Sequence, residues 1–524
     1  KKQIESLEKS LDVYKEVETV IDRLFQRWEG YQPIFRESWL EHYENIINTQ
    51  FLLDSLTDDS KYLADALRIS EKGKAAYLSY LFNESNAREA ALIPIEMRKK
   101  ERSILNQIIQ RERQLDNVGK GAIEKRKEVM LELFKLREER DEFIDSLELL
   151  YPKYQALKRK TNTITPKQIQ TDILSDNQSL IEYFVGDQHL YIFLIQKDNY
   201  EVKRLDMDFP VKDWIDRIIL RMKKESIDDY DYFDEAHLLY QKLISPIESY
   251  LTQNEELVII PDGELNRLPF NLLLREMPLE NSLDNHLDHS YLALEYVPSF
   301  CYSASLLYLM KQQEFDTKYR RRDYLGIAPD FSKALKFSPL KENMNEAKIG
   351  KQILQSGDVL LGKNATKRKV VESLPRYKII NFSTHGFSSD GITNEPILIL
   401  GGENGGYDTL AYSELFTLDL NAELVILSAC ETQAGILQGD GEGLINLTRG
   451  FSYAGSKTVI ANLWSANEAY SLRFWELFYQ EIKEGVPKNR ALNNSIRKMM
   501  NGIDRAPYFW AGFMLVGDID SIEL

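Results

Sequence analysis

The chain has 524 residues, 43% of them hydrophobic and 28% charged, which is the composition of a globular protein long enough for two to four domains. Its 66 Lys and Arg against 82 Asp and Glu give a formal net charge of −16, which disfavours direct nucleic-acid binding or an anionic membrane surface. The two cysteines, Cys301 and Cys430, exclude a disulfide framework and favour a reducing, cytoplasmic setting. No apolar run reaches the roughly 18 residues of a membrane-spanning helix. The sequence starts in a helical pattern without methionine, so we expect the natural amino terminus to lie upstream.

Residues 1–160 are predicted to be helical, because apolar and charged residues alternate there at helical spacing. Residues 1–80 predict packed helices. The helical pattern of residues 81–160, with a break near residues 116–121, predicts a long antiparallel helical hairpin that turns at the break. We interpret this hairpin as a structural linker packed on the next domain.

The character of the sequence changes at Thr161. Two apolar runs around Gly186-Asp187 predict a β-hairpin over residues 180–195, and alternating strands and helices follow. This alternation predicts a doubly wound α/β sheet, which charged connections near residue 315 divide into two halves, 161–315 and 316–524. The expected strands are residues 257–260, 324–328, 378–382, 424–427, 458–461 and 513–516, and the expected helices include 442–453, 468–483 and 489–500.

Two segments in the second half place a reactive side chain directly after a buried strand. Tyr377–Gly386 (YKIINFSTHG) presents His385, and 45 residues later Glu423–Thr432 (ELVILSACET) presents Cys430. The carboxyl ends of neighbouring parallel strands lie at one edge of a sheet, so the two residues are expected to meet there. A cysteine near a histidine can form a thiolate nucleophile.

Small residues flank both side chains, and we expect both to lie outside the packed core. The amides of Gly386 and Cys430 would then donate to an oxyanion. A buried structural cysteine and a hydrogen-bonded histidine are each the commoner explanation alone, and only their joint placement favours catalysis.

Two glycine clusters, residues 401–406 and 439–443, lack the Lys-Ser/Thr ending of a phosphate loop, and no cofactor or metal site is predicted. The first cluster is typical of a hairpin turn and the second of a mobile loop after Cys430. Asp440 and Glu442 in that loop either attract a basic substrate side chain or cap the helix that follows. The turn at residues 261–263 is interpreted as structural.

Most of residues 165–524 resembles CHAT domains, which are caspase-like proteases usually fused to tetratricopeptide repeats. Residues 60–115 also resemble the helical linker of that family, and the helices before it resemble degenerate terminal repeats. The segments that carry the resemblance are Ile260–Phe270 (IPDGELNRLPF), Val297–Ser299, Ser383–Gly386, Leu427–Thr432 (LSACET), Gly439–Gly443 (GDGEG), Thr448–Phe451, Ala454–Gly455, Val459–Trp464 (VIANLW) and Trp510–Phe513.

The resemblance implies a caspase/hemoglobinase-like (clan CD) cysteine endopeptidase that cleaves a protein substrate. It assigns His385 as general base or orienting residue and Cys430 as nucleophile, and it makes residues 316–524 the catalytic half and 161–315 a catalytically empty half. It further implies a regulatory protein partner bound through the helices, in a setting such as bacterial defence or programmed cell death. Gln433 departs from the family pattern, in which glycine often follows the Cys-Glu-Thr run.

The sequence also suggests a substrate preference. Acidic residues near the two reactive side chains favour a basic residue before the scissile bond over a small, apolar or aspartate residue; they are Asp390, Glu395, Asp440 and Glu442. Two alternatives remain at this stage: a non-catalytic caspase-like scaffold, and a Cys/His amidotransferase or other acyl-transfer enzyme.

Overall fold

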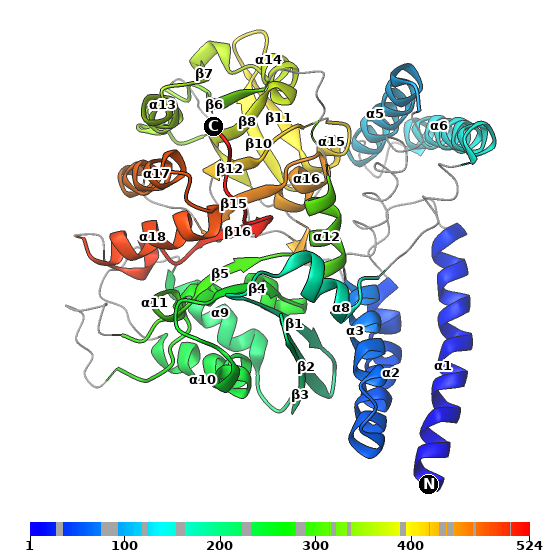
Figure 1. The fold of residues 1–524 in the computed structure, drawn as a ribbon. Coiled ribbons are helices and arrows are strands. Elements are labelled where there is room, and N and C mark those ends of the chain that lie inside the picture. The colour runs from blue at the N-terminus through cyan, green and yellow to red at the C-terminus, as the bar shows by residue number, and fades with distance from the viewer. Residues whose placement is uncertain are drawn as a thin grey trace. The chain divides into compact units, whose positions relative to one another are not determined.

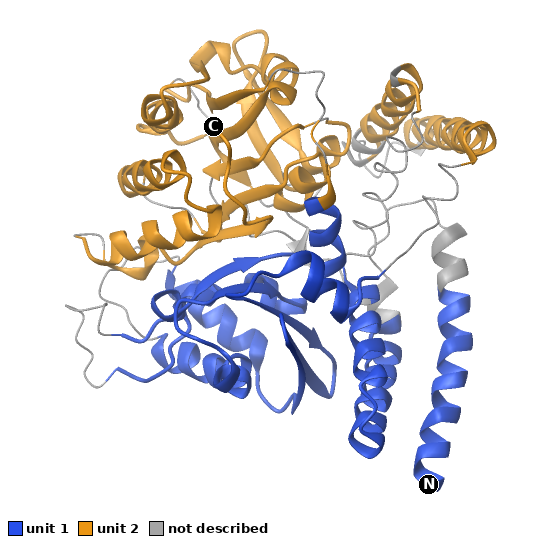
Figure 2. Ribbon diagram, viewed as in Figure 1, with its two compact units in different colours: residues 1–77, 162–311, 437–444 blue, residues 78–161, 312–436, 445–524 orange. Residues whose placement is uncertain are grey.

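The computed structural model describes the chain except for residues 28–34, 75–92, 118–122, 153–162, 223–231, 279–288, 314, 316–320, 333–336, 388–394, 419, 429–435, 438–443, 446, 465–467 and 503–504. The chain divides into two compact units (Figure 2). Unit 1 comprises residues 1–77, 162–311 and 437–444, and unit 2 comprises residues 78–161, 312–436 and 445–524.

Unit 1 contains helices and part of a mixed sheet, with neighbouring strands in the order β3-β2-β1-β4-β5 (Figure 1). Strands β1 to β3 form an antiparallel meander, and β1, β4 and β5 are parallel. The predicted hairpin is confirmed, with Val185 opposite Leu190. The strands are β1 (Gln178–Val185), β2 (His189–Gln196), β3 (Asn199–Asp206), β4 (Glu256–Ile260) and β5 (Val297–Phe300).

Both faces of this sheet are covered, and the inner positions of β1 and β2 are accordingly all buried and mostly apolar. The hydroxyl of Tyr183 donates to the carbonyl of Leu243 at the end of α10, and that of Tyr200 donates to the carbonyl of Leu63 in α3. The helices of unit 1 are α1 (Lys2–Arg27), α2 (Phe35–Thr57), α3 (Lys61–Gly73), α8 (Pro166–Gln168), α9 (Val211–Met222), α10 (Phe233–Leu243), α11 (Leu292–Glu295) and α12 (Ala304–Gln312).

Buried carboxylates attach α2 and α3 to the rest of unit 1. Glu44 of α2 accepts hydrogen bonds from the backbone N–H groups of Asp187 (2.8 Å) and His189 (2.8 Å) in the β1–β2 turn. Glu71 of α3 accepts from the N–H groups of Ala304 and Ser305, where α12 begins. The amino-terminal helices and the first sheet therefore form one packed body.

The sheet of unit 2 has the strand order β16-β15-β12-β8-β6-β7. Five of these strands are parallel, whereas β16 runs antiparallel to β15, so the sheet is mixed and not a uniform doubly wound sheet. All five strands expected here are confirmed, and β7 is additional. The strands are β6 (Arg322–Ala328), β7 (Asp358–Leu361), β8 (Tyr377–Ser383), β12 (Leu424–Ser428), β15 (Thr458–Asn462) and β16 (Phe513–Gly517).

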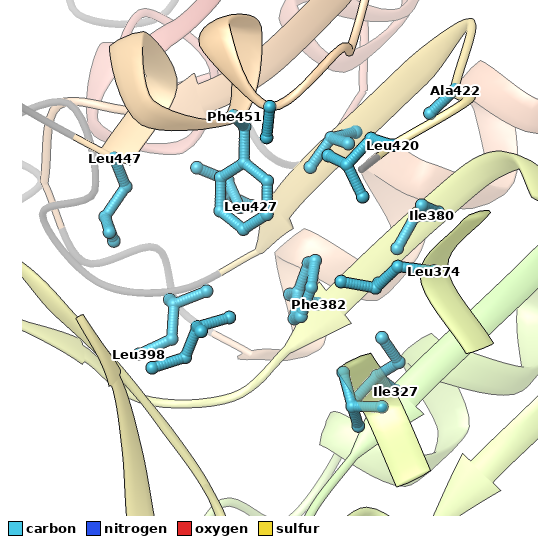
Figure 3. Packing of buried hydrophobic residues seen from close by; sticks show 14 of the residues in the cluster. Ile327, Leu374, Ile380, Phe382, Leu398, Leu420, Ala422, Leu427, Leu447 and Phe451 are labelled. Carbon is cyan, nitrogen blue, oxygen red and sulfur yellow. The ribbon is translucent and has the colours of Figure 1, made fainter. Parts of the chain in front are cut away.

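Helices cover both faces of this sheet (Figure 1). Alternate side chains of β8 point to opposite faces: Phe382 packs with Leu427 and Phe451 in the core shown in Figure 3, whereas Ser383 faces α13. The helices around the sheet are α13 (Asn343–Leu354), α14 (Lys367–Ser373), α15 (Tyr412–Leu415), α16 (Leu447–Tyr453), α17 (Glu468–Lys483) and α18 (Lys488–Met500).

Unit 2 also contains a small sheet and a helical hairpin. A three-stranded antiparallel sheet follows β8 and confirms the hairpin turn at residues 401–406; it consists of β9 (Gly386–Phe387), β10 (Ile397–Gly401) and β11 (Tyr407–Ala411). Helices α5 (Ile95–Asn117) and α6 (Ile123–Leu150) form the predicted antiparallel hairpin. Short strands β13 (Ile436–Leu437) and β14 (Leu444–Ile445) pair on either side of residues 438–443.

No helix within the described ranges is long and apolar enough to span a membrane.

Candidate active site

The parallel pairing of β8 with β12 positions the candidate catalytic segment. Ser383, the last residue of β8, pairs in register with Ser428, the last residue of β12. His385 follows Ser383 by two residues, and Cys430 follows Ser428 by two residues in the sequence. Cys430 itself lies outside the described residues, as do Asp390, Asp440 and Glu442.

The ring of His385 is fixed by a hydrogen bond to the backbone. Its Nε2 lies 2.8 Å from the carbonyl oxygen of Ser338. A carbonyl oxygen only accepts hydrogen bonds, so Nε2 carries the proton, and Nδ1 is the acceptor of the neutral ring. The imidazole is therefore held in the tautomer that leaves Nδ1 able to take a proton.

Aromatic side chains surround His385, contrary to the expectation from its small neighbours in the sequence. Phe331 lies edge-on with ring centroids 4.6 Å apart, and Phe387 is stacked at 6.0 Å. Tyr407 of β11 stacks on Phe331. His385 is only 8% exposed, so the expectation that it lies outside the packed core is wrong. The aromatic residues come from the segment after β6 and from β9 and β11, which no local sequence pattern links to the histidine.

Burial lowers the pKa of His385, because a desolvated imidazole disfavours its charged form. The hydrogen bond to Ser338 and the negative charge of Glu468 act in the opposite direction. The neutral imidazole, which is the form that accepts a proton, therefore predominates at neutral pH.

Gly386 begins the short strand β9. Ile399 donates its N–H to the carbonyl of His385 (2.9 Å), and the next pair is Leu398 opposite Gly386. Hydrogen-bonded and non-hydrogen-bonded pairs alternate in an antiparallel ladder, so the N–H of Gly386 is directed away from β10. This orientation is compatible with the expected oxyanion role of that amide.

A cavity of about 50 Å³ lies at the carboxyl ends of β8, β12 and β15, where α13 and α17 meet the sheet. Its volume is enough for about three or four water molecules. The polar side chains that line it are Asn343, Glu346, Ser383, Thr384, Ser428, Asn462, Glu468 and Ser471.

Glu346 forms the floor of a hydroxyl network in this cavity. Its carboxyl accepts hydrogen bonds from Ser383 (3.1 Å) and Ser471 (2.9 Å). Burial raises the pKa of Glu346 to about 7, although the neighbouring serine hydroxyls oppose this shift. The sequence analysis missed this residue; the available signal was a carboxylate on the sheet-facing stripe of α13, with Asn343, Ala347 and Gly350.

Of the four predicted substrate-pocket residues, only Glu395 lies within the described residues. Its carboxylate accepts a hydrogen bond from the N–H of Ser413 in α15 (2.9 Å), and it does not line the cavity. The part of the chain that the structure describes contains no group of three or more His, Cys, Asp or Glu residues arranged to hold a metal ion.

Comparisons with known proteins identify relatives over part of the chain. Tetratricopeptide repeat protein 28 from Homo sapiens is 24% identical over 327 residues, and that from Mus musculus is 25% identical over 335 residues. Each match covers 53% of this chain and only 13% of the relative, so the chain spans a small fraction of the length of these proteins.

Two solved structures are similar at low identity. The Arg-specific cysteine proteinase gingipain R is 12% identical with a TM-score of 0.36, over 60% of this chain and 74% of that one. The Saccharomyces cerevisiae separase–securin complex is 12% identical with a TM-score of 0.35, over 93% of this chain and 34% of that one.

The family model for the CHAT domain matches residues 234–518, which is more than half of the chain. This protein, with a helical amino-terminal region and a mixed α/β sheet core, belongs to the CHAT domain family.

Proposed function

We propose that this protein is a cysteine endopeptidase that uses His385 and Cys430 as a catalytic dyad. The observation that carries the proposal is the register of β8 and β12, which ends both strands at the same edge, each two residues before a dyad member in the sequence. The neutral tautomer of His385, with Nδ1 as acceptor, supports a general-base role.

The reaction follows from these groups. The Cys430 thiol gives its proton to Nδ1 of His385, and the thiolate attacks the carbonyl carbon of the scissile peptide bond. The amides of Gly386 and Cys430 stabilise the resulting oxyanion. The protonated His385 then donates to the leaving amine as the C–N bond breaks, and water hydrolyses the thioester to release the acid and restore the thiol. Ser338 positions the imidazole throughout.

Substitution of the dyad tests this proposal. Cys430→Ala and His385→Gln should each reduce cleavage of a peptide library by at least about a thousandfold. Gln is preferred to Ala at position 385 because the side chain packs against Phe331. Cys301→Ser is the matched control, since that thiol is buried in unit 1 and donates a hydrogen bond to the carbonyl of Ser303. Cleavage near the wild-type rate in either dyad variant would refute the assignment.

We further propose that a protein partner regulates this activity through the amino-terminal helices. The observation that supports this is the attachment of α2 and α3 to the first sheet by Glu44 and Glu71. A fragment beginning at residue 161 would remove these contacts, so the test uses the whole chain. Glu44→Gln should change the basal cleavage rate by more than about twofold if the helices control the enzyme; an unchanged rate would argue against regulation by this route.

A further inference from the structure

We propose that the cavity beside His385 is a specificity pocket for a basic side chain of the substrate, with Glu468 as the residue that selects it. This inference rests on the proposed endopeptidase function and specifies its substrate class. The residues that line the pocket all belong to unit 2, and Glu395, the one predicted acidic residue that the structure describes, is not among them.

Glu468 brings a negative charge to the cavity, near enough to His385 to affect its pKa. It begins α17, lines the cavity and accepts a hydrogen bond from the backbone N–H of Glu342 (2.6 Å). It is partly exposed, and within the described residues no Lys or Arg forms an ion pair with it. The carboxylate is therefore fixed in position while its charge remains available to a ligand.

Asn462 supplies an independent indication of a ligand. Its side chain is 5% exposed and lines the cavity, and its Oδ1 has no hydrogen-bond partner among the described residues. A buried amide oxygen without a partner costs roughly 1–3 kcal/mol, so a donor from a ligand would be favourable there. Only a hydrogen-bond donor satisfies an amide oxygen.

The remaining lining completes a surface suited to a cation. The hydroxyls of Ser428 and Ser471 lie 3.3 Å apart and accept as well as donate. None of the described residues that line the cavity is Lys, Arg or His. A guanidinium or ammonium group donates to all of these acceptors, whereas an acidic side chain would be repelled by Glu468.

The pocket is also electrostatically linked to the dyad. The charge of Glu468 raises the pKa of His385 against the effect of burial. A cation bound at Glu468 would cancel part of that effect and favour the neutral, proton-accepting imidazole. A basic side chain bound in the pocket thus favours the neutral, proton-accepting form of His385.

Matched peptides that differ only before the scissile bond test the proposal in the full-length protein. The wild type should cleave Arg or Lys peptides at least about tenfold faster in kcat/KM than Gln or Leu peptides, and Asp peptides slowest. Glu468→Gln should remove most of this preference while sparing the Leu peptide. Glu476→Gln, which alters an exposed residue of the same helix paired with Arg473, should keep the wild-type preference.

Two further readouts separate failure of the pocket from failure of the proposed function. Agmatine, a free guanidinium compound, should raise the unfolding temperature of the wild type and of Cys430→Ala but not of Glu468→Gln. The acidic limb of the kcat/KM profile for the Leu peptide should move to lower pH in Glu468→Gln, because the charge that raises the histidine pKa is gone.

Each outcome decides one question. Cleavage that depends on Cys430 but prefers Leu or Asp, or that retains its Arg preference in Glu468→Gln, would overturn the pocket assignment and leave the protease intact. Agmatine stabilisation that is lost in Glu468→Gln, together with cleavage that does not need Cys430, would support the cation site and overturn the dyad.

Discussion

The two units end their parallel strands in different ways. In unit 1, the carboxylate of Asp262, just after β4, accepts a hydrogen bond from the N–H of Val185 at the end of β1 (2.7 Å), and Glu44 fills the adjacent turn. In unit 2, the ends of β8, β12 and β15 border a cavity, and the edge carries His385. The carboxylates at the first edge accept hydrogen bonds from the backbone, whereas Glu346 and Glu468 at the second edge are hydrogen-bonded and also line the cavity.

The same arrangement of parallel strands can therefore end in a structural edge, as in unit 1, or in a candidate active site, as in unit 2. Both edges are built from short parallel strands that are buried on both sides. At the second edge the residues are small or polar, namely Ser383 and Ser428, and they leave room that no side chain of the described residues occupies. The polar groups of the second edge border a cavity, and for this reason we consider that edge a candidate active site.

The largest effect on stability is expected from the buried ion pair of unit 1. Nζ of Lys74 lies 2.7 Å from Oε1 of Glu182, and the two side chains are 3% and 0% exposed. Burial raises the pKa of Glu182 to about 8, with the charge of Lys74 opposing that shift. Lys74→Met should lower the free energy of unfolding by about 3 kcal/mol, because it leaves a buried carboxyl without its cation.

Urea unfolding of the full chain measures this loss. The loss should be smaller at pH 5, where the unpaired Glu182 takes up a proton, than at pH 8, and adding Glu182→Gln should restore much of it. An equal loss at both pH values would contradict the role given to this pair.

A second prediction concerns Glu346 in unit 2. Its folded-state pKa of about 7 lies above its ordinary value of 4.5, so the folded protein binds this proton more tightly than the unfolded chain. Stability is therefore lost as pH rises from about 4.5 through 7, by up to about 3 kcal/mol. Glu346→Gln removes the titration, so the wild type should lose stability relative to this variant between pH 5 and pH 8.

Thermal unfolding of both proteins across that pH range checks the prediction. The difference between their unfolding temperatures should shift in favour of the variant as pH rises. If the unfolding temperatures of the two proteins changed in parallel with pH, Glu346 would be ionised in the folded protein throughout this range. The prediction would then be wrong, and the hydrogen bonds to the carboxylate would outweigh the effect of burial.

The smallest effect is expected at the structural edge of unit 1. Asp262→Ala leaves the N–H of Val185 without its acceptor and should cost about 1–3 kcal/mol. Asp262→Asn retains an acceptor and is the matched control. Neither variant should alter kcat/KM once folded protein is counted, and a loss of cleavage without a loss of stability would place chemistry at an edge that we interpret as structural.

The sequence predicted the strands well because each is a short apolar run between turn residues. It also selected His385, because that histidine and Cys430 both follow a buried-strand pattern and both have small neighbours. It did not predict that β16 runs antiparallel, because the direction of pairing depends on the connection and not on the strand's own residues.

Other features depend on residues far apart in the chain. The rings of Phe331 and Phe387 contact His385, and the ring of Tyr407 stacks on Phe331. The pair Lys74–Glu182 joins the end of α3 to β1. Glu468 resembled an ordinary first-turn acidic residue of a helix. Only the folded chain brings such residues to a common site.

The rate at which iodoacetamide alkylates Cys430 tests the central claim most directly, because it needs no knowledge of the substrate. In the full-length protein with Cys301→Ser as background, the alkylation rate should rise through a pKa well below the roughly 8.5 of a free thiol. His385→Gln should return that pKa to the ordinary value. A Cys430 that reacts as an ordinary thiol, with the same pH profile in the presence and absence of His385, would contradict the dyad.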